Sequence, residues 1–283
     1  MDIQIKPVTT NKAFEAIMQI SAKAWGAPSL DDSVPSHTLR AIADNKGTVL
    51  MAWDNHKPIG FCFSIFSFTG TTISDPNLHF YHYSHQAGVL PEYRGWRVGE
   101  KLKWAQREAV LDQGVNLITW TFDPLQTLNA KLNIHKLGAT SSTFKRHYYG
   151  DMDDDLNRGL PTDRFKVSWW IGSDWVTSHA NQTYQSPSLS DSHFRYTQIN
   201  TAVLKNNRLT PKATHTESWS NDLILTIPKN FTDIHKADLE LAIAWKLHVR
   251  ELFELAFERG YTAVDLLTQN DRCHYLLQKN WDS

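Results

Sequence analysis

The sequence has few cysteines, no excess of charge of either sign and no long hydrophobic run. Its two cysteines, Cys62 and Cys273, are far apart, which excludes a disulfide framework and a zinc knuckle. The 29 Lys and Arg residues balance 30 Asp and Glu residues, which argues against a polybasic membrane anchor or a dedicated nucleic-acid-binding protein. No segment reaches the roughly 18 apolar residues of a membrane span, and the first residues lack the apolar region of a signal peptide. We therefore expect a cytoplasmic protein with no membrane or nucleic-acid partner.

The sequence does contain enough apolar residues for a core of normal size. Apolar residues make up 41% of its 283 residues, as in ordinary globular proteins, and the length suits one large domain or two small ones. Tryptophan (11) and histidine (13) are frequent. Large aromatic side chains mostly pack in cores and at domain interfaces, so we expect that role for the tryptophans.

Hydrophobic periodicity predicts a β-α-α-β-β-β-α-β-α-β-β order within the first 170 residues or so. The predicted strands are 3–9, 47–53, 58–68, 79–90, 117–122, 140–149 and 164–171, and the predicted helices are 12–25, 36–45, 96–113 and 123–137. Residues 70–77 are expected to form a loop, and Asp54 to Lys57 a hairpin turn.

The composition changes after residue 172. Ser, Thr, Asn, Gln and His dominate as far as about residue 220, which predicts a polar connector with one short strand at 198–204. Order returns with a strand at 223–227, a helix at 238–259 and strands at 261–267 and 273–278. We predict a domain at 1–172, a connector at 173–221 and a smaller α/β subdomain at 222–283. A weak repeat, Lys-x-x-x-Arg-Glu followed by Gly and a strand, relates 103–122 to 246–267 and indicates either a duplication or two helix-strand units.

The most informative segment joins the fourth predicted strand to the third predicted helix. From Val89 to Leu102 it reads Val-Leu-Pro-Glu-Tyr-Arg-Gly-Trp-Arg-Val-Gly-Glu-Lys-Leu. A turn with glycines at a helix N-terminus exposes backbone N–H groups and is suited to bind an anion. The segment resembles the acetyl-CoA signature of the Gcn5-related N-acetyltransferase (GNAT) superfamily, Val-x-Pro-x-x-Arg-Gly-x-Gly-Val-Gly-x-x-Leu. It departs from that pattern at Glu92, where Gln or Arg is usual, and at Arg97, where Gly is usual.

A second segment, Asn129 to Ala139, resembles the fourth-helix pattern of the same superfamily through Ala130, Lys136, Leu137 and Gly138. Ile134 replaces the tyrosine that often protonates the leaving CoA thiolate. Together with Ile118–Leu125 and Gly159–Arg164, the segment is similar to a group of bacterial predicted GNAT acetyltransferases with an added C-terminal half.

The resemblance implies an α/β (α+β type) fold with a mixed, mostly antiparallel, splayed sheet and helices on both faces. It implies acetyl-CoA as the acyl donor and direct transfer to an amine in a ternary complex. The acceptor is then a small-molecule amine or a peptide. The sequence predicts no particular oligomeric state for the protein. The residues expected to bind acetyl-CoA are Ala87, Gly88, Val89, Arg94, Gly95, Trp96, Arg97, Val98, Gly99, Asn129 and Asn133, although the two asparagines could equally face water.

Catalysis requires a base, because an alkyl amine is protonated at neutral pH. Alternation along the fourth strand places His79, Tyr81, Tyr83 and His85 on one face and Phe80, His82, Ser84 and Gln86 on the other. In GNAT enzymes that use a strand base, its usual position falls at Tyr81, whereas His85 has the more suitable pKa. Tyr149, or its neighbour Tyr148, is the candidate acid in place of the missing helix tyrosine.

Structural explanations compete with these assignments. Histidines on a strand are most often structural, and Asp123 is expected to be a helix N-cap. His82 of the fourth strand lies on the opposite face from His79 and His85, and the acidic stretch 151–162 lacks the Gly and Glu of a calcium loop, so we expect no metal. The functional alternatives are an acyl-CoA-binding or sensing module without catalysis, and a transferase that uses another acyl donor.

Overall fold

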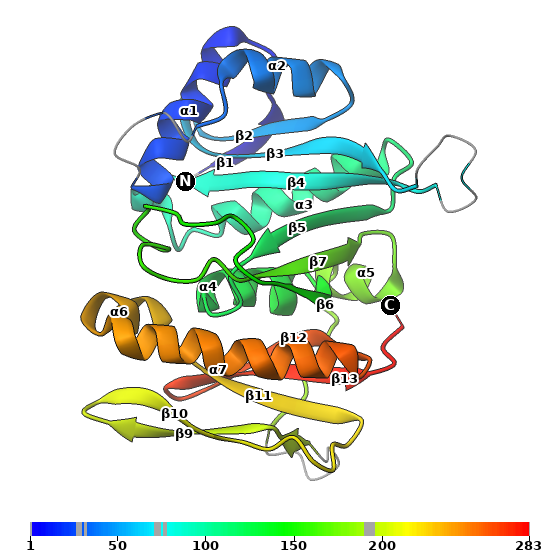
Figure 1. Cartoon of the computed structure of the whole chain (residues 1–283). Helices are drawn as coiled ribbons and strands as arrows, with labels where there is room; N and C mark the ends of the chain where they lie inside the picture. Colours follow the sequence, from blue (N-terminus) through cyan, green and yellow to red (C-terminus); the bar gives the residue numbers. More distant parts are fainter. Residues whose placement is uncertain are drawn as a thin grey trace. The chain divides into compact units, whose positions relative to one another are not determined.

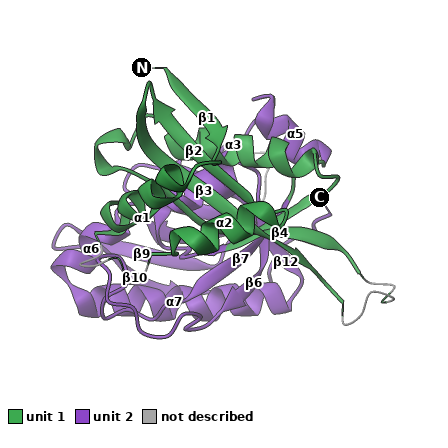
Figure 2. Ribbon diagram, turned by 90° about the horizontal axis from the view of Figure 1, so that it is seen from above, with its two compact units in different colours: residues 1–120, 170–172 green, residues 121–169, 173–283 purple. Residues whose placement is uncertain are grey.

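In the computed structural model, which describes residues 2–26, 30, 33–70, 75, 78–189 and 196–282, the chain passes repeatedly between two units (Figure 2). Unit 1 contains residues 1–120 and 170–172, and unit 2 contains 121–169 and 173–283. The domain boundaries predicted at residues 172 and 221 stay predictions, because these units divide the chain differently.

The sheet of unit 1 has the strand order β1-β2-β3-β4-β5. Neighbouring strands run antiparallel except β4 and β5, which are parallel. The predicted hairpin turn is confirmed, since Asp54 pairs with Lys57 and Asn55 between them adopts a φ of 53°. These strands are β1 (Ile3–Pro7), β2 (Thr48–Asp54), β3 (Lys57–Phe68), β4 (Phe80–Val89) and β5 (Leu117–Phe122).

Helices cover both faces of this sheet (Figure 1). On one face, α1 (Asn11–Trp25) and α2 (Ser36–Asp44) pack their apolar residues against Phe61 and Phe63 of β3. On the other face, Val98 and Leu102 of α3 (Val98–Leu111) pack against Cys62. Thr10 caps the N-terminus of α1 by accepting a hydrogen bond from the Ala13 N–H. The predicted mixed α/β fold is therefore confirmed for this part of the chain.

The sheet of unit 2 has the order β7-β6-β12-β13-β11-β8. Its strands are β6 (Thr140–Lys145), β7 (Arg164–Trp170), β8 (Thr197–Gln198), β11 (Asp222–Pro228), β12 (Tyr261–Gln269) and β13 (Arg272–Lys279). Two antiparallel pairs, β6–β7 and β12–β13, each follow a helix and meet where Ser141 of β6 pairs with Ala263 of β12. The structural repeat in unit 2 is thus a helix followed by two strands.

Helix α7 (Leu239–Glu258) supplies much of the core of unit 2. Asp238 caps it by accepting a hydrogen bond from the Leu241 N–H. Phe253 lies at the centre of an aromatic cluster, with ring centroids 4.6 Å from Phe165 and 5.2 Å from Tyr275. The predicted helix at 238–259 is confirmed, and the short helix α6 (Phe231–Ala237) precedes it.

Two stretches of unit 2 differ from the sequence prediction. The helix expected at 123–137 is a short α4 (Thr127–Ala130) continued by a π-helix, η2 (Lys131–Lys136). The expected polar connector contains helix α5 (Asp174–Ala180) and a hairpin of β9 (Asn200–Lys205) and β10 (Arg208–Thr214). Weak apolar periodicity concealed these elements, because side-chain and backbone hydrogen bonds order much of the segment.

The loop predicted at 70–77 lies largely outside the described residues. Among the residues that are described, no helix has the length and apolar character needed to cross a membrane.

Candidate active site

The predicted strand-turn-helix junction is present in unit 1. Strand β4 ends at Val89, a short 3-10 turn, η1, follows at Pro91–Tyr93, and α3 begins at Val98. Gly95 has a φ of +83°, and a Cβ built on it would meet no atom within 4 Å. Glycine is therefore favoured at this position by its backbone conformation, not by crowding.

The N-terminus of α3 presents backbone donors to this turn. The first helical bond runs from the Lys101 N–H to the Arg97 carbonyl, so the N–H groups of Val98 and Gly99 have no carbonyl partner within the helix. Arg97 occupies the N-cap in the left-handed region, with a φ of 59° and no side-chain cap bond. It thus adopts the conformation that glycine favours, at the position where the GNAT pattern has glycine.

The charged side chains of the turn contact neighbouring protein groups. The Arg94 guanidinium donates to the Ala24 carbonyl at the end of α1, over 2.5 Å. Arg97 donates to both carboxylate oxygens of Glu100, which raises the pKa of Arg97. The charges of Arg94 and Arg97, two of the residues expected to bind acetyl-CoA, are therefore engaged by neighbouring groups. The backbone N–H groups of Val98 and Gly99 are the donors that this turn offers to an anion.

Glu92 and Trp96 complete the turn. Glu92 lies 3.3 Å from Lys57 Nζ, and hydrogen bonds from its own backbone and from Lys57 lower the pKa of Glu92. Its negative charge is thereby paired on the surface. Trp96 is exposed over 55% of its surface, so its indole is accessible from solvent.

Strands β4 and β5 part shortly after they meet. They pair only at His82 with Ile118 and at Tyr83 with Thr119, whereas β4 pairs with β3 along its whole length. Within the described part of unit 1, residues 84–89 of β4 have no strand pairing toward β5. The segment with this open edge includes Ala87, Gly88 and Val89, which were predicted to bind the pantetheine arm of acetyl-CoA.

A β-bulge at His85 changes the predicted alternation of β4. Ser84 pairs with Ser64 and Gln86 with Phe63, so His85 is the inserted residue. The bulge turns Gln86 to the same face as His85, and the prediction that Gln86 shares a face with Ser84 is wrong. Bulges re-aim side chains and are common beside active sites, and here the bulge displays His85.

His85 is exposed at the surface and packs beside two aromatic rings. Its ring centroid lies 5.5 Å from Phe63 and 6.1 Å from Tyr83. Desolvation by these surroundings lowers the pKa of His85 below 6.5. The imidazole is therefore neutral at pH 7 and able to accept a proton. Tyr81, the other base candidate, is half-buried on the same face of the strand.

The opposite face of β4 carries a buried polar network that the sequence analysis missed. His82 Nδ1 lies 2.8 Å from Ser64 Oγ, which lies 2.6 Å from Thr48 Oγ1. Gln106 of α3 connects Thr48 to Ser84 and to Lys103, whose amine donates to Gln106 Oε1 over 2.8 Å.

Lys103 is the most unusual member of this network. Its side chain is wholly buried, and desolvation lowers the pKa of Lys103 to about 7. Near pH 7 the amine is thus divided between its two forms, with Nζ 3.8 Å from the centre of the Trp120 ring. Burial raises the pKa of nearby Cys62 to about 12, so its thiol is protonated and is no nucleophile. The signal for the network was present in the helical spacing of Leu102, Gln106 and Val110, which places Gln106 on the buried stripe.

The remaining predicted site residues lie in unit 2. Tyr149 is 42% exposed, and its hydroxyl lies 2.8 Å from Thr121 Oγ1. Asn129 is exposed and Asn133 is buried, although residues four apart share one face of a regular α-helix. The π-helix accounts for this difference, since its i→i+5 bonds change the angular spacing of side chains. Ile134 is fully buried.

Asp123 is not the helix N-cap that the sequence predicted, because Gln126 occupies that position. One oxygen of Asp123 accepts the Leu125 N–H, and the other lies 2.6 Å from Lys246 Nζ. Its role is a buried ion pair within unit 2. Among the described residues no group of three or more His, Cys, Asp or Glu side chains is arranged to hold a metal ion.

No protein-family profile and no curated protein sequence matches the chain. Solved structures are similar to it at low sequence identity. They include yncA from Salmonella typhimurium with its cofactor acetyl-CoA (15% identity, TM-score 0.46, covering 67% of this chain and 99% of that one). A GNAT-family acetyltransferase from Streptococcus pneumoniae has 14% identity and a TM-score of 0.48 over 60% of this chain and all of that one. Aminoglycoside 6'-acetyltransferase type Ii has 15% identity and a TM-score of 0.46 over 61% and 99%.

The structure itself supplies the features that the sequence resemblance implied for the fold. A mostly antiparallel sheet carries helices on both faces, the fourth and fifth strands are parallel and part, and the glycine-containing turn joins the fourth strand to the third helix. The architecture therefore agrees with the fold that the sequence resemblance to the GNAT superfamily implies.

Proposed function

We propose that this protein is an N-acetyltransferase that takes the acetyl group of acetyl-CoA and transfers it directly to an amine in a ternary complex. The parting of β4 from β5 immediately before the turn and α3 carries the proposal. An extended, amide-containing arm can pair with the open edge of β4, while the phosphates at its other end meet the N-terminus of α3.

The protein must assist three events of the reaction. The amine nitrogen attacks the thioester carbon, the carbonyl oxygen gains negative charge, and the thiolate then leaves. The resemblance to the GNAT superfamily implies that a backbone N–H near Val89 stabilises that oxygen. Fixed hydrogen-bond donors commonly have this role in acyl transfer. No metal is required for any of these steps.

His85 is the proposed base that removes the amine proton. It is neutral at pH 7, displayed by a bulge and exposed to an acceptor that approaches from solvent. Tyr81 lies four residues before His85 on β4 and is the competing candidate for the base. For the acid, Tyr149 is retained from the sequence analysis, since the tyrosine that is usual in the fourth helix is a buried Ile134.

The first test is calorimetric titration of the full chain with acetyl-CoA and with CoA. Micromolar binding is expected, and Gly99→Trp should abolish it by filling the space before the first turn of α3. Glu108→Trp is the matched control, because Glu108 is exposed at the far end of the same helix. Absence of binding to either ligand would overturn the proposal.

A second test separates catalysis from simple binding. Single-turnover mixing with a panel of small amines and peptide N-termini should transfer radiolabelled acetyl to at least one acceptor. Tight binding of acetyl-CoA with no transfer to any member of a broad panel would favour a binding or sensing module. Binding of other acyl-CoA donors in preference to acetyl-CoA would instead change the donor assignment.

A further inference from the structure

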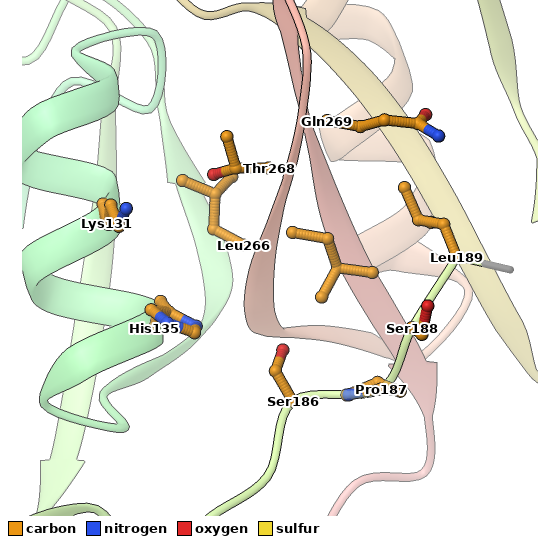
Figure 3. A pocket seen from close by; sticks show the side chains of 10 residues that line it. Lys131, His135, Ser186, Pro187, Ser188, Leu189, Leu266, Thr268 and Gln269 are labelled. Carbon is orange, nitrogen blue, oxygen red and sulfur yellow. The ribbon is translucent and has the colours of Figure 1, made fainter. Parts of the chain in front are cut away.

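Unit 2 contains a cavity of about 330 Å³ that the proposed acetyl transfer does not use (Figure 3). Three segments line it: helix η2 through Lys131 and His135, the segment that contains Ser186 and Leu189, and strand β12 through Leu266 and Thr268. Its volume is at the small end of the range for ligand sites. All of these segments belong to unit 2, so the cavity is built within one unit.

A buried carboxylate fixes one wall of the cavity. Asp265 is fully buried and accepts hydrogen bonds from His135 Nδ1 over 2.9 Å, from the Tyr184 hydroxyl over 2.8 Å and from Ser186 Oγ. Burial opposes its ionisation, but the hydrogen bonds from His135 and Ser186 outweigh this and hold the pKa of Asp265 below its usual range. Asp265 is therefore an anion that orients three side chains around it.

The orientation of His135 follows from that anion. Because Nδ1 must carry a proton to donate to Asp265, Nε2 is the nitrogen left for a ligand. An anionic ligand requires the imidazolium form, in which Nε2 also carries a proton to donate. Within the described part of the chain, Nε2 makes no hydrogen bond, and Lys131, four residues earlier on η2, has no ion pair. In Figure 3 both side chains lie on the side of η2 that faces the cavity. Two basic groups are thus available together at one end.

The rest of the wall combines an aliphatic patch with the polar side chains of Ser188, Thr268 and Gln269. Leu189 and Leu266 face the cavity from the side opposite η2 (Figure 3), and Pro187 and Leu267 add to this surface. Ser186 is already committed to Asp265. No arginine, the usual bidentate ligand of a phosphate, is among the described residues that line the cavity. A single charge with an apolar body fits this lining better than a phosphate does.

We propose that this cavity binds a small aliphatic carboxylate, with its anionic group between Lys131 and His135 and its hydrocarbon part against Leu189 and Leu266. A ligand of about eight to ten non-hydrogen atoms suits the space. Asp265 is a positioning residue in this site, because it acts through the lining residues His135 and Ser186. The inference concerns unit 2 alone and does not depend on acetyl transfer.

The test is a titration of the full chain, labelled at leucine methyl groups and histidine nitrogens, with 4-methylpentanoate followed by NMR. Saturable shifts are expected at Leu189, Leu266 and His135 Nε2, with a dissociation constant below about 1 mM. The uncharged 4-methylpentanamide should bind at least about tenfold more weakly. Equal binding of acid and amide, no saturable shift up to 10 mM (roughly ten times the expected constant), or binding of inorganic phosphate in place of the carboxylate would overturn the proposal.

Matched variants locate the site. His135→Asn keeps an N–H donor for Asp265 but removes Nε2, so it should preserve the thermal midpoint and lose affinity. Lys131→Met should weaken binding about fivefold or more, whereas Lys205→Met, an exposed lysine elsewhere in unit 2, should leave it unchanged. Unchanged affinity in Lys131→Met and His135→Asn would contradict the proposal. If His135→Asn fails to fold, the affinity of Lys131→Met for the carboxylate still tests the proposal. Acetyl-CoA affinity, measured separately, shows whether the two sites fail together.

Discussion

Lys246 Nζ lies 2.6 Å from Asp123 Oδ2, and only 2% and 5% of the two side chains are exposed. Burial lowers the pKa of Lys246, and the Asp123 carboxylate opposes that effect. The pair joins helix α7 to the segment that precedes α4, 123 residues apart in sequence and both within unit 2. Removing one partner would leave a buried charge without compensation.

Lys246→Met should therefore lower the free energy of unfolding by about 3–5 kcal/mol, measured by urea titration. Asp123→Asn combined with Lys246→Met should recover part of this loss, since no isolated charge remains. Arg146→Met is the control, because Arg146 is 63% exposed in its pair with Glu254 and should cost less than about 1 kcal/mol. A small effect of Lys246→Met would mean that water reaches Asp123.

Gly95→Ala should weaken acetyl-CoA binding by altering the turn. Both Gly95 (φ +83°) and Gly114 (φ +75°) have a left-handed backbone and no atom within 4 Å of a built Cβ. Alanine at either position should cost about 1 kcal/mol of stability through conformation alone. Calorimetry should detect reduced affinity only for Gly95→Ala, and equal affinities in the two variants would remove the turn from the binding site.

The pH dependence of kcat/KM should identify the base. His85 must be deprotonated to accept a proton, and desolvation lowers its pKa, so the acid limb should have an apparent pKa below 6.5. His85→Gln should reduce kcat about 100-fold and remove that limb. His79→Gln, on an exposed residue beside the start of the same strand, should change neither. Loss of activity in Tyr81→Phe with normal activity in His85→Gln would transfer the role to Tyr81.

Lys103 should make stability depend on pH in the alkaline range. Its pKa is about 7 in the folded protein and 10.5 in an ordinary setting, so between these values the unfolded chain binds a proton that the folded chain does not. Stability then rises with pH across this window, by up to about 1.4 kcal/mol per pH unit. Urea titrations at pH 7, 8 and 9 should show this slope in the natural protein and its loss in Lys103→Met. Identical slopes would show that Lys103 stays charged.

Local patterns predicted the fold of unit 1 well. Alternation, helical spacing and turn residues located its strands and helices to within a few residues, because each of these elements has one apolar face and polar ends. The motif at residues 89–102 likewise located the turn before α3. Such features depend on neighbours in sequence and are therefore readable from it.

Features that depend on distant partners were not predicted. The bulge at His85 arises from register against β3, and the Lys103 network and the Asp123–Lys246 pair need residues from separate elements. The weak repeat of Lys-x-x-x-Arg-Glu indicated either a duplication or two helix-strand units, and it gave no pairing for the two strands. In the structure β5 pairs in parallel with β4, whereas β12 pairs antiparallel on both sides. Pairing partners and direction are properties of the assembled sheet.

The pairing of β6 with β12 also bears on how the protein avoids association with other chains. A strand at the margin of a sheet offers unpaired N–H and C=O groups that can template addition of a foreign strand. In unit 2, β12 occupies that margin of β6, and β13 and β11 extend the sheet beyond it. The residues after β11 thus protect the edge of β6 from other chains. A chain truncated before them would expose β6 as an unpaired edge strand, which favours self-assembly and aggregation.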